Sequence, residues 1–179
     1  MKKTLAGMMV LMAGAALAAT TFSGRLLLKP DWSHKKTQGQ STLEETFGSF
    51  LAWTHTSGTN ANQMATIVSR EGTLADGESI TYDLTNIDNG FGDNVNFAVV
   101  RFMAFSCETG AIEIGAADSN AFVNWVGASG DTIKVRPGGI ALFVAPDLTG
   151  YAVGTAGNLK ILNTTTNTIT YTMYIGGSE

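Results

Sequence analysis

The chain has 179 residues, of which 44% are hydrophobic and only 15% charged, and its formal net charge is −4. One core is expected at this length, and low charge with abundant Gly, Thr, Asn and Ser is typical of sheets and turns. Nucleic-acid binding is disfavoured as the main role, because the one basic cluster is the short Lys29–Lys36 segment. Cys107 is the single cysteine, so we expect no disulfide and no Cys-based metal site, and we interpret it as a buried small hydrophobe.

Residues 1–18 have the three parts of a secretory signal. Lys2 and Lys3 begin the segment, Leu5–Leu17 is apolar, and small residues end it at Ala18. The pattern predicts cleavage after Ala18. Two alternatives remain: a retained membrane anchor, since no charge occurs between residues 4 and 24, and a start codon set too far upstream.

Short strands separated by turns are predicted along the first half of the chain. Alternation is plainest in Ser79–Leu84, which places Ile80, Tyr82 and Leu84 on an inward face. Residues 43–53 favour a strand over a short helix. The predicted strands in this half are Thr20–Leu28, Leu43–Trp53, Gln63–Leu74, Ser79–Leu84 and Val95–Phe105.

Val95–Phe105, with the sequence VNFAVVRFMAF, is the longest apolar run and predicts the central core strand. Gln63–Leu74 predicts an edge strand, because it carries the charged pair Arg70 and Glu71. Four bulky residues of the apolar run are expected in the core: Phe97, Phe102, Met103 and Phe105.

The second half predicts more strands around glycine-rich turns at Gly127–Gly130 and Arg136–Gly139, the latter a tight hairpin turn, and Pro146 ends one of them. The last two segments, separated by Asn163–Asn167, predict a closing hairpin. The predicted strands are Ala111–Ile114, Phe122–Val126, Thr132–Val135, Ile140–Ala145, Leu159–Leu162 and Thr168–Ile175.

Eight to ten short strands without a convincing helix predict an all-β fold, an antiparallel β-sandwich resembling a jelly roll. The expected organisation is a signal-like or hydrophobic segment at residues 1–18, an N-terminal strand and arm at 19–36, and a single β-sandwich domain at 37–179. No repeat of fixed period favours a propeller or a solenoid.

The sequence predicts no catalytic, cofactor-binding or metal-binding residues. His34 and His55 are the only histidines, and no strained nucleophile elbow accompanies them. Asp83–Asp93 offers oxygen donors but fails the EF-hand spacing, so a structural turn is the interpretation. Three nearby carboxylates are expected to be solvated rather than paired for glycoside hydrolysis: Glu108, Glu113 and Asp118.

Over about residue 19 to the C-terminus the chain resembles a family of small tailed-bacteriophage virion structural proteins, often described as hypothetical phage proteins. Residues 1–18 depart from this family, which does not normally carry such a segment. The residues that carry the resemblance are turn residues and their order: Gly115-Ala116-Ala117, Ser119–Phe122, Gly127, Gly130-Asp131, Val135–Gly139, Ala145–Asp147, Thr149–Val153, Leu159–Ile161 and Ile175–Ser178.

The resemblance implies a non-enzymatic virion protein, most simply a capsid decoration or minor capsid protein, with a tail or neck protein as the alternative. Its expected partners are the major capsid protein or tail subunits, and copies of itself in a homo-oligomer such as a trimer. We expect the arm Thr20–Lys36 to attach the domain. The alternative from another class is an exported carbohydrate- or surface-binding module, which could stack ligands on Trp32, Trp53 or Trp125.

Overall fold

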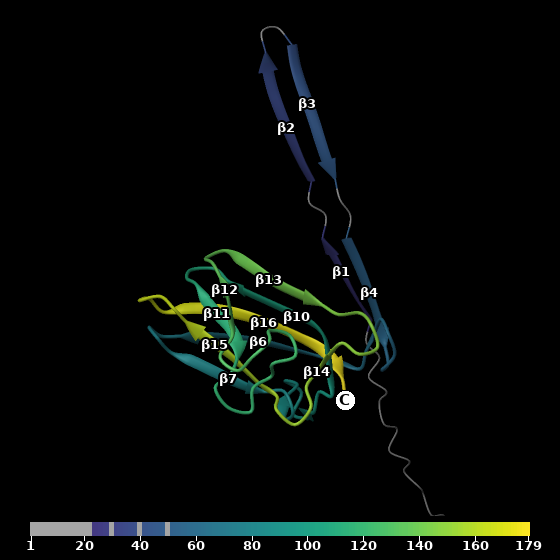
Figure 1. Ribbon diagram of the computed structural model, residues 1–179, viewed down its shortest axis with the longest axis vertical. Helices are drawn as coiled ribbons and strands as arrows, with labels where there is room; N and C mark the ends of the chain where they lie inside the picture. The colour runs from purple at the N-terminus through teal and green to yellow at the C-terminus, as the bar shows by residue number, and fades with distance from the viewer. Residues whose placement is uncertain (1–22, 29–30, 39–40, 49–50) are drawn as a thin grey trace, which may run out of the picture.

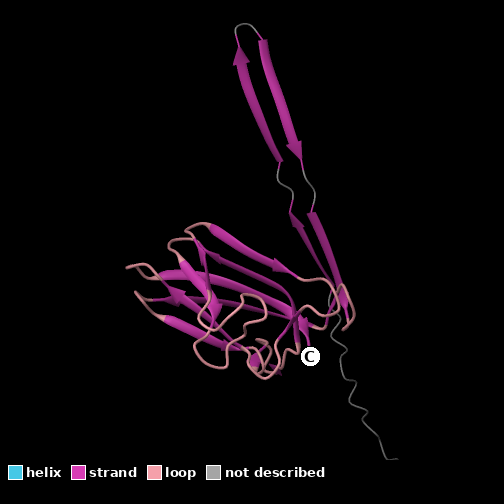
Figure 2. Cartoon of the chain, in the orientation of Figure 1, coloured by secondary structure: helices cyan, strands magenta, loops and turns pink. Residues whose placement is uncertain are grey.

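The computed structural model describes residues 23–28, 31–38, 41–48 and 51–179, and their regular secondary structure is β-strand (Figure 2). The signal-like segment at residues 1–18 lies outside the described residues. In the described ranges no helix is long and apolar enough to cross a membrane.

Two antiparallel sheets pack face to face (Figure 1). The five-stranded sheet contains β13 (Gly139–Val144), β10 (Val99–Cys107), β16 (Ile169–Ser178) and β6 (Thr66–Leu74) in this order, and β14 (Tyr151–Ala152) also pairs with β10. The four-stranded sheet has the order β12 (Thr132–Val135), β11 (Ile112–Ala116), β15 (Asn158–Asn163) and β7 (Ser79–Asp83). The predicted all-β sandwich is confirmed.

The connections between these strands are those of a jelly roll. The chain passes from one sheet to the other at β6–β7, β7–β10, β10–β11, β12–β13, β14–β15 and β15–β16, and the first of these strands, β6, pairs with the last, β16. Such double-sheet wrapping brings the two ends of the domain into one sheet. The predicted places of β6 as an edge strand and β10 as a central strand are both confirmed.

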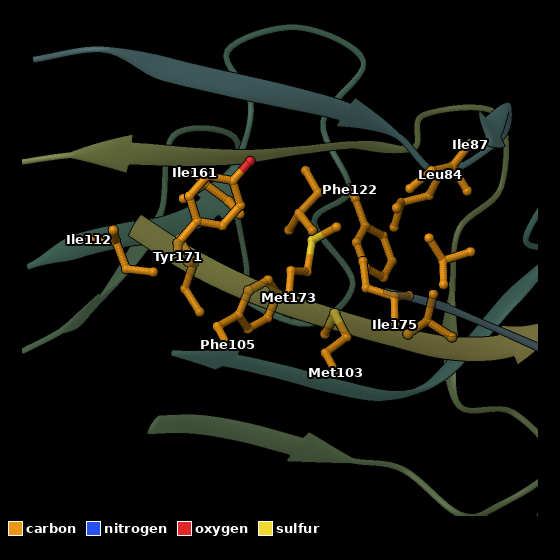
Figure 3. Packing of buried hydrophobic residues seen from close by; sticks show 14 of the residues in the cluster. Leu84, Ile87, Met103, Phe105, Ile112, Phe122, Ile161, Tyr171, Met173 and Ile175 are labelled. Atoms are coloured by element: carbon orange, nitrogen blue, oxygen red, sulfur yellow. The ribbon is translucent and has the colours of Figure 1, made fainter. Parts of the chain in front are cut away.

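Alternation along β10 and β16 builds the core between the sheets (Figure 3). Phe97, Met103, Phe105 and Cys107 are buried as predicted. Phe102 is only half-buried, because alternation sends it with Ala104 and Ser106 to the other face of β10. The opposite sheet contributes Ile112, Ile114, Leu159 and Ile161 to this core.

The prediction of a strand at Phe122–Val126 is wrong. The segment is a loop with a tight turn, in which the Val126 and Gly127 amides both donate to the Val123 carbonyl at 3.0 Å. Phe122 is fully buried, and Trp125 lies 5.0 Å from Phe143 and 6.4 Å from Phe105, ring centroid to ring centroid. The run is apolar because it packs against the core as a loop, and a short apolar run does not by itself specify a strand.

Both predicted hairpins of the second half are also wrong. A turn does form at Arg136–Gly139, with the Gly139 amide donating to the Arg136 carbonyl at 2.8 Å, but it joins strands of different sheets. The two closing strands, β15 and β16, likewise lie in opposite sheets. Alternation identifies each strand but not its partner, and the jelly roll pairs strands that are distant in sequence.

The first strands form a two-stranded arm. β1 (Ser23–Leu28) pairs with β4 (Leu51–Ser57), and β2 (Asp31–Gln38) pairs with β3 (Ser41–Gly48). The single strand predicted at residues 43–53 is therefore two strands, and the boundary predicted between residues 36 and 37 falls inside β2. Two-residue strands complete the description: β5 (Gln63–Met64) pairs with β4, and β8 (Ile87–Asp88) pairs with β9 (Asn94–Val95).

Candidate functional site

The arm is the feature that departs most from a closed sandwich. It leaves the end of the molecule where β14 and the C-terminus lie, and β2 and β3 extend well beyond both sheets (Figure 1). An isolated two-stranded hairpin is marginally stable in water at best. Among the described strands, β2 and β3 pair only with each other.

The register of the β2–β3 hairpin places Trp32 opposite Phe47, His34 opposite Glu45 and Lys36 opposite Leu43. By strand alternation these three pairs of positions share one face, so apolar and charged residue types are mixed on it. The other face has polar positions, including Ser33 opposite Thr46 and Lys35 opposite Glu44. The register alone therefore gives the hairpin no purely apolar face.

Arg101 fixes the joint between arm and sandwich. It lies where the register of β10 against β16 shifts, between Val100 and Phe102, which is a β-bulge, and only 1% of it is exposed. Its guanidinium donates five hydrogen bonds. The acceptors are the carbonyl oxygens of Thr59 (2.8 Å), Gln63 (3.2 Å), Asp147 (3.1 Å) and Leu148 (3.1 Å), and the Ser178 hydroxyl (3.0 Å).

These acceptors come from three segments that are distant in sequence. They are residues 58–65, which we call the arm base, the loop after β13, and the end of β16. A buried charge is tolerated when its donors are satisfied in this way. Burial lowers the pKa of Arg101, and the charge of Asp147 opposes that shift. The guanidinium stays charged, since its ordinary pKa is so high.

Backbone contacts extend the joint on the outer side of the five-stranded sheet. The Asn62 amide donates to the Pro146 carbonyl at 2.7 Å, and the Ala65 amide donates to the Gly177 carbonyl at 2.7 Å. Met64 is buried, and its sulfur lies where a Cβ on Gly176 would stand, at 2.6 Å. Gly176 is therefore required for the arm base to pack closely on β16.

His55, on β4, is buried in the joint with 3% of its surface exposed. Among the described residues neither ring nitrogen has a hydrogen-bond partner. Burial lowers the pKa of His55, and the positive charge of Arg101 lowers it further. The imidazole is held neutral, which is a structural role and provides no neighbouring nucleophile.

The outer face of the five-stranded sheet, beyond the area that Met64 covers, has apolar residues on β13 and β10 and polar residues toward β6, where Ser69 is opposite Tyr174 and Glu71 is opposite Thr172. In one row across the sheet Leu142, Ala104 and Tyr174 are adjacent, and Ile140 follows in the next row. Ile140 is 76% exposed and Tyr174 43% exposed. We call this surface the open face; its residues are Phe102, Ala104, Ser106, Ile140, Leu142, Val144, Thr172 and Tyr174.

The Asp83–Asp93 loop is a structural turn, as predicted. The Asp88 carboxylate accepts from the Gly90 amide at 2.6 Å, and the Asn89 side-chain oxygen accepts from the Phe91 amide at 2.7 Å. Arg70 donates to the Asp88 carbonyl. These bonds present Phe91, which is 90% exposed, at the tip of the loop. Across the described ranges no three His, Cys, Asp or Glu residues gather closely enough to hold a metal ion.

The hydrogen bonds of Arg101 can hold the start of the arm on the sandwich and fix its orientation. Sequence analysis did not identify Arg101 as a candidate site residue. Arg101 was read only as part of the apolar run VNFAVVRFMAF. A charge in the middle of such a run is a usable signal, because a buried charge requires several partners. The open face had a signal too, since β13 is apolar at consecutive positions rather than alternate ones.

No protein-family model matches the chain. No curated protein matches it either. Among solved structures, the cupin domain of Schizosaccharomyces pombe Cnp3 is similar at 8% identity over 83% of each chain, with a TM-score of 0.35. A likeness of this degree does not bear on activity or partners.

Proposed function

We propose that the protein is a non-enzymatic structural protein of a tailed-phage virion, most simply a capsid decoration or minor capsid protein on the particle surface. The observation that carries the structural role is the projecting β2–β3 hairpin, which extends beyond its own sandwich (Figure 1). Such an arm gains stability by packing on another subunit.

The assignment to a phage particle rests on the resemblance to phage virion proteins. The glycines that carry this resemblance have a structural role in this fold. Gly130, Gly138 and Gly150 have φ of +81°, +70° and +52°, so the matched glycines are at turns that disfavour other residues. Jelly rolls also occur in lectins and cupins, so the fold alone does not select the virion.

The test is particle composition. Mass spectrometry of purified particles should find the protein at a fixed ratio to the major capsid protein, and its intact mass shows whether residues 1–18 are retained. Separated heads and tails distinguish a capsid protein from a tail or neck protein. Absence from washed particles would reject the virion role.

Exported carbohydrate binding is the second class to test. Trp125 packs among Phe105, Phe122 and Phe143, which supports a core role for it rather than ligand stacking. Trp53 is half-buried on β4. Retention on a glycan array, together with recovery from the culture medium and absence from particles, would favour the binding module instead.

A further inference from the structure

We propose that two copies of the chain associate through the edge strand β13, whose outer side pairs antiparallel with β13 of the second copy. The five-stranded sheets of the two copies then continue into one another, and their open faces join. The inference rests on the proposed structural role and adds the contact between copies. Its grounds are the backbone groups, the composition, the exposure and the flanking charges of β13.

The backbone of β13 has one paired side and one outer side. The Ala145 amide donates to the Arg101 carbonyl at 2.9 Å, so the backbone groups of every second residue from Ala145 back along β13 face β10. In an antiparallel ladder the residues in between turn their amide and carbonyl groups the other way. Those residues are Ile140, Leu142 and Val144. Among the described strands β13 pairs only with β10, so its outer side can accept another strand.

The composition of β13 differs from that of the other sheet edges. The strand orders of the two sheets end at β13, β6, β12 and β7 (Figure 1). The last three carry charged residues, which oppose pairing with another chain: Arg70 and Glu71 on β6, Lys134 on β12 and Asp83 on β7. β13 has the sequence GIALFV, without a charge or a proline. Among these four described edges, β13 is therefore the one best suited to a further strand.

The side chains of β13 are also incompletely covered. Ile140 is 76% exposed, and Phe143 is only half-buried although it packs against the core. On the neighbouring strand β10, by contrast, Met103 and Phe105 are fully buried. A second strand beside β13 would remove apolar surface from water on both faces of the sheet, which favours association.

A second copy is the occupant because the strand complements itself. A twofold axis beside Leu142 places Leu142 opposite Leu142, and Ile140 opposite Val144, so the outward backbone groups of the two copies can bond to each other. Arg136 and Asp147, both exposed, flank the strand at its two ends. Antiparallel pairing brings Arg136 of each copy to the end where Asp147 of the other lies, whereas parallel pairing would bring like charges together.

The length of β13 sets the strength of the dimer. Six residues make a strand about 20 Å long, and an edge contact of that length buries well under the ~1,200 Å² of small stable interfaces. We therefore expect a concentration-dependent dimer with a dissociation constant of about 10–100 μM. Copies held side by side on a particle have a high local concentration, so a contact of this strength is enough there.

Sedimentation equilibrium of the full-length chain between about 5 and 500 μM tests the dimer. The apparent mass of the wild type should rise with concentration from the chain mass, 18.8 kDa, toward twice that mass. The test variants are Leu142→Lys and Leu142→Glu, each of which places like charges directly opposite each other in the dimer. Their controls are Thr73→Lys and Thr73→Glu, at an exposed position of β6 on the other edge of the same sheet.

Each Leu142 variant alone should dimerise at least about tenfold more weakly than the wild type, and both controls should match the wild type. An equimolar mixture of the two Leu142 variants should recover dimerisation, because Lys then lies opposite Glu. Hydrogen exchange of the wild type gives a second reading. Exchange at the amides of Ile140, Leu142 and Val144 should slow as the concentration rises, while Ala141 and Phe143, which face β10, should not change.

Edge pairing is overturned by a wild type that stays monomeric at the highest concentration, a Leu142 variant that dimerises like the wild type, a monomeric control, or a mixture that stays monomeric. Exchange at Ile140, Leu142 and Val144 that does not depend on concentration also overturns it. That measurement uses the wild type alone, so it decides the question even where circular dichroism shows that a substitution disturbs the fold. None of these results depends on particles, whereas the virion role is read from the composition of purified virions, so the two failures are separate outcomes.

Discussion

Replacing Arg101 by leucine should loosen the joint and destabilise the whole sandwich. The substitution keeps much of the aliphatic volume but removes all five donors, leaving four carbonyl oxygens and the Ser178 hydroxyl without this partner. Because the acceptors lie on three separate segments, no single local shift can satisfy them again. Water can reach some of them only if the arm base moves away from the sheet.

The magnitude follows from the count of bonds. Five hydrogen bonds at about 1 kcal/mol each would total about 5 kcal/mol, and relief of guanidinium desolvation returns part of this. A net loss of about 3 kcal/mol is expected, which corresponds to a fall in Tm of about 6–12 °C for a chain of this size. Arg101→Lys keeps the charge but offers three donors, so about half of this loss is expected.

Urea unfolding gives the free energy, and hydrogen exchange locates the loss. Exchange should accelerate most at the amides of Gly58, Asn62 and Ala65, whose bonds hold the arm base. Arg70→Leu is the control, because Arg70 is more exposed, donates to the Ser69 and Asp88 carbonyls, and forms only a solvent-exposed ion pair with the Asp88 carboxylate at 4.0 Å. This substitution should cost under about 1 kcal/mol. A loss under 0.5 kcal/mol in Arg101→Leu, or unchanged exchange at the arm base, would refute the reasoning.

Two further predictions concern the same end of the molecule. Because the folded state lowers the pKa of His55, the unfolded state binds the proton first as the pH falls. The free energy of unfolding should therefore decrease below pH 6.5 by up to about 1.4 kcal/mol per pH unit. Urea melts from pH 7.5 to 5.5 should show this slope, which His55→Phe should flatten and the control His34→Gln should retain. Gly150→Ala should lower the free energy of unfolding by about 2–3 kcal/mol, since its Cβ would stand 2.8 Å from the Val100 carbonyl oxygen at φ +52°. Gly77→Ala, at φ +66° with open space around it, should lower it by only about 1 kcal/mol. Equal losses of the two variants in chemical denaturation would show that the contact with Val100 does not matter.

The sequence predicted strands well where one face is buried. Ser79–Asp83 alternates between half-buried and exposed positions, and Met103, Phe105 and Cys107 follow the same period along β10. Alternation there is a direct consequence of the pleat against a core, so the positions of these strands and the all-β fold could be read locally.

Pairing could not be read in the same way. Turn chemistry at Arg136–Gly139 is compatible both with a hairpin and with a corner between sheets, because the turn fixes the backbone direction only locally. Phe122–Val126 has strand composition, but its side chains fill the core edge from a loop. Both errors concern long-range packing, which the local pattern does not encode.

The candidate site was partly predictable for a different reason. An arm was expected from the basic residues up to Lys36, yet the returning strands β3 and β4 lack a clean apolar period. An arm away from the core has no buried face of its own, so the usual signal is weak. The role of Arg101 depends on carbonyls from residues 59, 63, 147 and 148, whose proximity arises only in the folded chain.

The hydrogen bonds of Arg101 affect how strongly the arm can bind another surface, because they limit the orientational entropy that the arm has left to lose on docking. A hairpin on a loose tether loses orientational freedom when it docks, and that loss subtracts from affinity. Arg101 ties the arm base to β10, to the loop after β13 and to the end of β16, so the direction of β1 and β4 is set by the sandwich. Arg101 therefore both stabilises the sandwich and fixes the direction in which the arm leaves it.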